Sequence, residues 1–79
     1  MSPTIFRADG YRFFFFSREE RRKHVHVFSA EGEAKFWLEP EIELAKNYRY
    51  SSRNLNHIEK LIKEHYHEII NAWERHFDN

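Results

Sequence analysis

The chain has 79 residues, no cysteine, and 13 basic against 13 acidic residues, so its formal net charge is zero. This length allows one domain, the lack of cysteine excludes disulfides and thiolate metal sites, and the charge balance argues against a dedicated nucleic-acid binder. Aromatic residues make up 18% of the chain and must supply much of the core.

The apolar segments indicate where the protein resides. The start, MSPTIFRADG, has no charged segment followed by a long apolar run, so it does not look like a secretory signal. No apolar run approaches the ~18 residues that a membrane span needs. We therefore expect a cytoplasmic protein without membrane contact, and the absence of cysteine agrees with a reducing compartment.

Two β-hairpins are predicted in residues 3–38. Residues 4–7 and 11–16 flank Asp9-Gly10, which is a strong turn signal because glycine accepts a positive φ. Residues 24–28 and 33–38 flank a second loop, from Ser29 to Gly32. These segments predict an antiparallel sheet of about four strands.

The remaining chain is predicted to be helical. Pro40 suits the first turn of a helix, so residues 40–47 are expected to form a short helical turn. Ser51 or Ser52 is a plausible N-cap for one long helix over residues 52–77. An apolar stripe follows this helix at spacings of three and four, through Leu55, Ile58, Ile62, Ile69, Trp73 and Phe77. The predicted fold is a single α+β domain, residues 1–79, with this helix packed on one face of the sheet.

Strand alternation divides the second hairpin into two faces. The apolar face carries Val25, Val27, Ala34, Phe36 and Leu38. The other face carries His24, His26, Phe28, Glu33, Lys35 and Trp37. A loop from Ser29 to Gly32 places Phe28 opposite Glu33, His26 opposite Lys35, and His24 opposite Trp37. We expect the helix to cover the apolar face and not to reach the histidines.

The second face has two interpretations at this point. A contiguous aromatic patch on a small protein marks a surface for a partner or a ligand. Alternatively, the loops at residues 17–23 and 39–50 fold over this face and bury it. Both interpretations stay open.

The histidine pair suggests acid–base chemistry. His24 and His26 could serve as general acid and general base, because histidine titrates near neutral pH. Lys35 could stabilise an anion such as a transferring phosphate. As ordinary amphipathic side chains at a sheet edge, the same residues would have no chemical role.

Neighbouring residues suggest an RNA ligand. Arg21, Arg22 and Lys23 could hold a polyanion, while Phe28 and Trp37 could stack bases. With the histidines they would form a ribonuclease-like surface. Two histidines with Glu33 could share a metal ion, but no third ligand has diagnostic spacing, so we expect no metal and no cofactor.

Five stretches together are similar to one family: SPTIFR, GYRFFFFS, HVHV, GEAKFWLEP and AWERHF. In this order they closely resemble the small bacterial domain-of-unknown-function family numbered 4160, over nearly the whole chain. The resemblance implies one half of a two-gene module, similar to a toxin–antitoxin pair. The family motifs are matched here by His24, His26, Glu33, Lys35, Phe36 and Trp37.

Two functions are compatible with these patterns. The first is the toxin side of such a module, acting on RNA with His24 and His26 as acid–base groups. The alternative is a non-enzymatic module that binds a small protein encoded nearby through its aromatic face. Homo-oligomers are compatible with the same surface, and a pH- or metal-responsive use of the six histidines is a third interpretation.

Overall fold

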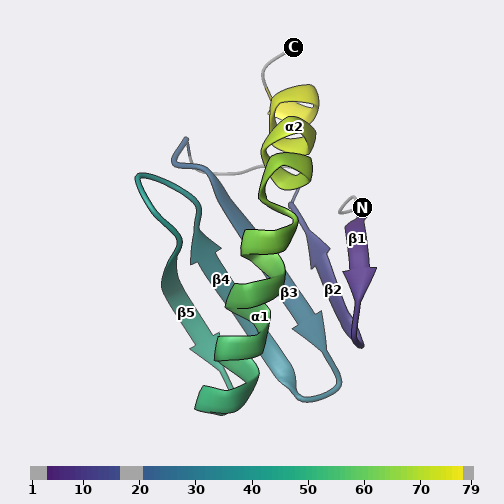
Figure 1. Ribbon diagram of the computed structural model, residues 1–79, viewed down its shortest axis with the longest axis vertical. Helices are drawn as coiled ribbons and strands as arrows, with labels where there is room; N and C mark the ends of the chain where they lie inside the picture. Colours follow the sequence, from purple (N-terminus) through teal and green to yellow (C-terminus); the bar gives the residue numbers. More distant parts are fainter. Residues whose placement is uncertain (1–3, 17–20, 78–79) are drawn as a thin grey trace.

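The described part of the chain forms a five-stranded antiparallel sheet followed by two helices (Figure 1). The computed structural model describes residues 4–16 and 21–77. The strands follow one another in the sheet in chain order, and the predicted α+β class is confirmed. The elements are β1 (Thr4–Ala8), β2 (Tyr11–Phe14), β3 (His24–Ser29), β4 (Gly32–Trp37), β5 (Glu43–Tyr48), α1 (Ser52–Glu64) and α2 (Tyr66–Phe77).

Both predicted hairpins are confirmed. Asp9 and Gly10 both have positive φ, 52° and 87°, as a two-residue turn that matches strand twist requires. In the second hairpin β3 pairs with β4 in the predicted register, with His26 opposite Lys35 and Val25 opposite Phe36. Local turn chemistry and alternation are therefore enough to fix this half of the sheet.

The short helical turn predicted at residues 40–47 is wrong. Glu43–Tyr48 instead form β5, which pairs with β4 through an irregularity between Lys35 and Phe36. The physical reason is that the edge of β4 carries unpaired N–H and C=O groups, and pairing with them outweighs the helical propensity of the segment ELAK. The sheet thus has five strands, and these residues extend it instead of folding over its second face.

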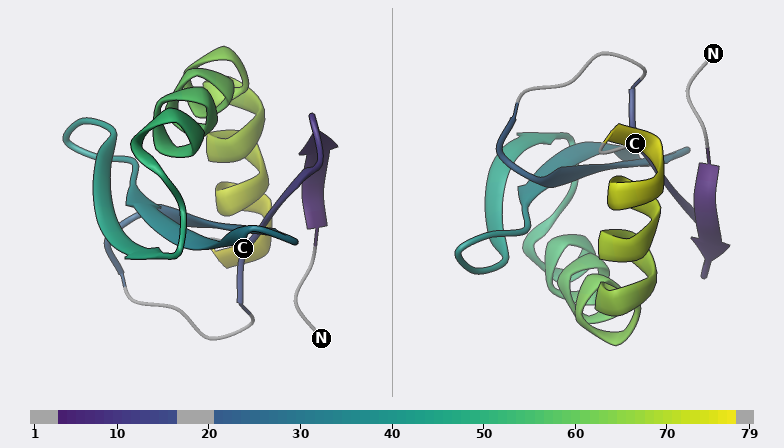
Figure 2. Two further views of the ribbon diagram at one scale, coloured as in Figure 1. Left: turned by 90° about the horizontal axis from the view of Figure 1, so that it is seen from below. Right: turned by 90° about the horizontal axis from the view of Figure 1, so that it is seen from above.

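The single long helix predicted for residues 52–77 is two helices. Ser51 is the N-cap, as predicted, and its hydroxyl accepts a hydrogen bond from the Asn54 N–H at 3.1 Å. At His65 the backbone leaves helical geometry (φ −107°, ψ 18°), and the His65 ring stacks on Phe6 of β1 at 4.1 Å. This break lets α2 change direction, so its last turns descend to the level of the sheet (Figure 2).

The core lies between the helices and one face of the sheet. All five residues of the predicted apolar face are buried, as are Ile58, Ile62, Ile69 and Trp73 of the predicted helix stripe. The edge strands stand up on either side of the helices, so the sheet curves around them (Figure 2). Burial of this apolar surface is the main source of stability.

Hydrogen bonds hold the corner between β5 and α1. The Asn47 side chain both accepts from the Tyr50 N–H and donates to the Tyr50 carbonyl. The Ser29 hydroxyl donates to Glu31 at 2.9 Å, so the buried Tyr50 hydroxyl must donate to Ser29 at 2.8 Å. Burial raises the pKa of Tyr50, while the Ser29 hydrogen bond opposes that rise.

We predict that Gly32→Ala destabilises the fold more than Gly10→Ala. A Cβ at Gly32 would overlap the carbonyl oxygen of Tyr48 in β5, whereas a Cβ at Gly10 meets nothing within 4 Å. Gly10→Ala should cost about 1 kcal/mol because of its positive φ, and Gly32→Ala roughly 2–4 kcal/mol because the β4–β5 pairing must shift. Urea denaturation of both variants measures the difference, and equal losses would contradict this packing of β5.

We also predict a loss of stability at alkaline pH that depends on Tyr50. Its pKa is raised on folding from the ordinary 10.0, so its contribution is complete below that pH. As the pH rises further, the unfolded chain loses this proton first, and the free energy of unfolding falls. Tyr50→Phe should therefore reduce the slope of stability against pH above about 10, and an unchanged slope would contradict the burial of this hydroxyl.

Candidate functional site

The face of the sheet opposite the helices brings most of the predicted site residues together. Residues directly opposite one another in an antiparallel sheet share a face, so the strand register defines this surface. We call it the outer face. It carries Thr4, Arg7, Arg12, Phe14, His24, His26, Phe28, Glu33, Lys35, Trp37, Glu43, Lys46 and Tyr48.

His24 does not lie on the exposed part of this face. Its side chain is 0% exposed, and its ring packs against Trp37 at 5.6 Å and against Trp73 of α2 at 5.3 Å. Its Nδ1 donates to the Arg22 carbonyl at 2.7 Å, because a carbonyl oxygen can only accept. The expectation that the helix does not reach the histidines is therefore wrong for His24, since the end of α2 reaches it. In this position the ring packs as part of the core.

His26 lies at a hollow in the outer face. It is half-buried, and its ring contacts His24 at 5.2 Å and Phe16 at 4.4 Å. The hollow has a volume of about 530 Å³. Its lining includes Phe16, His26, Glu33, Lys35, Lys46 and Tyr48. The structure thus brings three predicted residues together with two from β5.

Two pairs of like charges face each other across strands of the outer face. Arg7 of β1 lies directly opposite Arg12 of β2, and Lys35 of β4 lies directly opposite Lys46 of β5. Directly opposed like charges destabilise a sheet. The zero net charge of the chain therefore conceals basic side chains that lie next to each other on this face.

Trp37 and the basic segment before β3 form a cluster beside the hollow. The Arg22 guanidinium and the Lys35 ammonium lie 4.3 Å and 4.4 Å from the centre of the Trp37 ring. Arg22 also donates to the Glu39 carbonyl and pairs with Glu43 at 3.6 Å. Arg22, which was expected to hold a polyanion together with Arg21 and Lys23, is therefore held in place by these contacts.

The other two basic residues of this segment, Arg21 and Lys23, differ in exposure. Lys23 is half-buried and pairs with Glu39 at 4.0 Å, while Arg21 is exposed. Residues 17–20 belong to the segment 17–23 that one interpretation expected to cover the outer face, and they lie outside the described residues. Within the described chain, Arg21 and Arg22 are the exposed cations of this segment, and Arg22 is engaged with Glu39 and Glu43.

Exposed aromatic rings line the hollow or lie beside it. Phe28, a predicted site residue, is 48% exposed, and Phe16 and Tyr48 are 45% and 63% exposed. Sequence reasoning missed Lys46 and Tyr48 because their segment was expected to be helical. The stretch Leu44-Ala45-Lys46-Asn47-Tyr48 does not alternate between apolar and polar residues, so the sequence carried no strand signal there.

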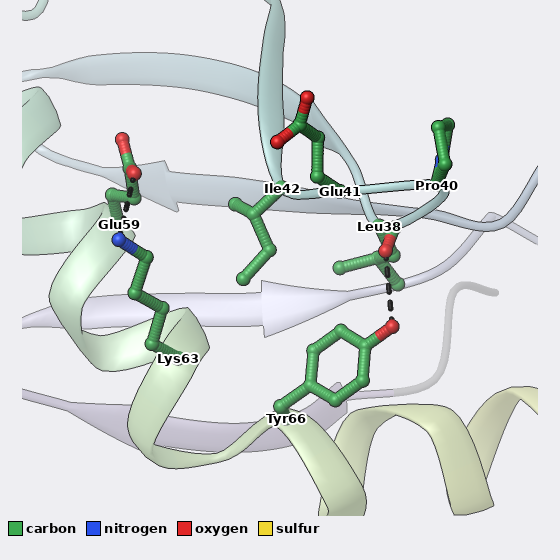
Figure 3. A pocket seen from close by; sticks show the side chains of 7 residues that line it. All are labelled: Leu38, Pro40, Glu41, Ile42, Glu59, Lys63 and Tyr66. Carbon is green, nitrogen blue, oxygen red and sulfur yellow. Dashed lines mark hydrogen bonds and ion pairs between the residues drawn. The ribbon is translucent and has the colours of Figure 1, made fainter.

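A second hollow, of about 450 Å³, lies on the helix side between residues 38–42 and α1 (Figure 3). Within it Lys63 pairs with Glu59 at 3.2 Å, the Tyr66 hydroxyl donates to the Leu38 carbonyl at 3.0 Å, and Glu41 is an exposed carboxylate. Because Lys63 is paired and Glu41 is acidic, this hollow offers an anionic ligand less than the outer face does.

Two features are absent from the described residues, namely a group of metal-binding side chains and a membrane-spanning helix. Among residues 4–16 and 21–77, no three histidine or acidic side chains gather closely enough to hold a metal ion. Within the same ranges, no helix combines the length and the apolar character that crossing a membrane requires.

We predict different outcomes for the two histidines of β3. His24→Ala should lower the free energy of unfolding by roughly 2–4 kcal/mol, because it leaves a cavity between Trp37 and Trp73. His26→Ala should cost less than about 1 kcal/mol, because His26 is half-buried. Chemical denaturation of both variants checks this, and a His24→Ala variant as stable as His26→Ala would contradict the packing role.

The comparisons with known proteins identify a family but no characterised relative. No curated protein and no solved structure matches the chain. The family model described as "Domain of unknown function (DUF4160)" matches residues 10–74, which include β2 to β5, all of α1 and most of α2. The chain therefore belongs to the DUF4160 family, as its sequence motifs predicted.

Proposed function

We propose that this protein is the toxin-side component of a two-gene module and binds single-stranded RNA through its outer face. One observation carries the RNA part of the proposal: two in-register cation pairs, Arg7–Arg12 and Lys35–Lys46, share a face with exposed aromatic rings. The module itself is implied by the family resemblance. It rests on no feature of the fold.

The cation pairs fit a phosphate backbone. The paired residues are directly opposite in the strand register, so each pair places two basic side chains next to each other, where a phosphate backbone could contact them. Arg7–Arg12 lies at the β1 side of the sheet and Lys35–Lys46 at the β5 side. A strand of RNA running across the sheet could contact both pairs.

The exposed rings fit unpaired bases. Phe28 lies on β3 and Tyr48 on β5, and single-stranded RNA is bound by stacking its bases on such rings across an open sheet. A double helix would hide the faces of its bases from these rings. The ligand that suits this surface is therefore single-stranded.

The arrangement supports binding better than histidine catalysis. His24 is fully buried and cannot touch a substrate in this conformation, so two histidines acting together on RNA lack support. Lys46 lines the same hollow as His26 and Lys35, and it is the exposed cation there that a bound phosphate would meet. We therefore propose RNA binding for the outer face and a packing role for His24.

A partner protein is the alternative ligand for this surface. Exposed rings such as Phe28 and Tyr48 also suit a protein interface, and a partner encoded nearby would then cover the outer face. This alternative predicts that Phe28→Ala abolishes capture of the neighbouring gene product, while a short single-stranded RNA does not bind at all. Pull-down and RNA binding measured on the same variant separate the two functions.

We predict that Lys46→Gln weakens RNA binding and its salt dependence. For single strands each lost phosphate contact reduces the slope of log K against log salt by about 0.7. Fluorescence anisotropy with a labelled ten-nucleotide RNA, repeated at several salt concentrations, measures this slope.

The matched control is Lys60→Gln, which removes an exposed lysine from α1. Its affinity and salt slope should equal those of the unchanged protein, because α1 packs on the opposite face of the sheet. Equal effects of Lys46→Gln and Lys60→Gln would contradict binding at the outer face.

A further inference from the structure

Glu33 is an acidic residue in the middle of the proposed RNA surface. It lies on β4 directly opposite both Phe28 of β3 and Tyr48 of β5, so exposed rings stand on either side of it. It also lines the hollow with Lys35 and Lys46. A carboxylate in this position repels phosphates, so a surface built only for a phosphate backbone would not carry it.

The Glu33 carboxylate is available to a ligand. The other acidic residue of the outer face, Glu43, is paired with Arg22 at 3.6 Å. Within residues 4–16 and 21–77, Glu33 is exposed and takes part in no side-chain hydrogen bond and no ion pair. Its two oxygens can therefore accept two hydrogen bonds from a bound group.

A carboxylate between stacking rings distinguishes the four bases. It can only accept hydrogen bonds, and guanine alone presents two adjacent donors, N1–H and the N2 amino group, on its Watson–Crick edge. Adenine and cytosine each place a ring-nitrogen acceptor beside their amino group, and that acceptor would repel the second carboxylate oxygen. Uracil presents one N–H between two carbonyl acceptors, so it also matches poorly.

We infer that the hollow around Glu33 is a subsite for guanine in single-stranded RNA. Glu33 accepts from N1–H and the N2 amino group, the base stacks on Phe28 or Tyr48, and Lys46 meets the adjoining phosphate. This inference rests on the proposed function, because it names the base that the same surface selects.

The experiment compares three RNAs of one length that differ at a single position. The first RNA is a seven-nucleotide oligouridine. The second carries a guanosine at its central position. The third carries an inosine there, which differs from guanosine by lacking the N2 amino group. The unchanged protein should bind the guanosine RNA at least about fivefold more tightly than the inosine or uridine RNA, which corresponds to one good bidentate contact. Fluorescence anisotropy at fixed salt gives the three dissociation constants.

Glu33→Gln should weaken binding of the guanosine RNA and strengthen binding of the plain oligouridine. The amide offers one acceptor and one donor group, so the preference for guanosine should disappear. Loss of the negative charge beside the phosphates should tighten binding of the plain oligouridine. The matched control Glu64→Gln, an exposed position on α1, should leave all three affinities unchanged.

The possible results separate this inference from the proposed function. If no RNA binds to the unchanged protein, both are overturned. If all three RNAs bind equally, or if Glu33→Gln alters them by one common factor, the guanine subsite is overturned while RNA binding stands. A guanosine preference that Glu33→Gln removes supports the subsite, because a purely structural role of Glu33 would not select one base.

Discussion

The packing of two amphipathic helices on one face of the sheet determines the rest of this structure. Ile58 and Ile62 of α1 and Ile69 and Trp73 of α2 are buried against that face, and the helices have no second apolar stripe for the other. The outer face is therefore covered by no helix of the described chain, although the sheet has five strands. An uncovered sheet face that keeps exposed aromatic rings is a natural surface for a ligand.

The same packing determines which outer-face residues a ligand can reach. The break at His65 turns α2 so that Trp73 meets His24 at the end of β3, and His24 becomes part of the core. Farther along the sheet, β5 places Lys46 and Tyr48 beside the residues of the HVHV and GEAKFW segments. Charge, aromatic rings and one carboxylate then meet at a hollow that no single segment of the sequence forms.

The sequence was informative where local interactions decide the structure. The Asp9-Gly10 turn, the register of β3 with β4 and the Ser51 cap depend on neighbouring residues, and all were predicted correctly. The pairing of β5 and the break at His65 depend on distant partners, namely the edge of β4 and the ring of Phe6. For this reason the helical turn and the single long helix were wrong predictions.

The same distinction between local interactions and distant partners applies to the candidate site. Alternation alone assigned His26, Glu33 and Lys35 to one face, and the structure places them at one hollow. The burial of His24 could not be predicted because it depends on where α2 ends in space. Membership in the DUF4160 family adds no assigned activity, so the physical character of the outer face is the strongest guide to function.

The most direct test of this account is an NMR titration of the labelled protein with a short single-stranded RNA. Amide resonances of Phe28, Lys46 and Tyr48 and ring resonances of Phe28 and Tyr48 should shift progressively, while amide resonances of exposed α1 residues such as Lys60 should not move. Shifts confined to α1 and α2, or no shift at any RNA concentration, would contradict the assignment of the outer face as an RNA-binding surface.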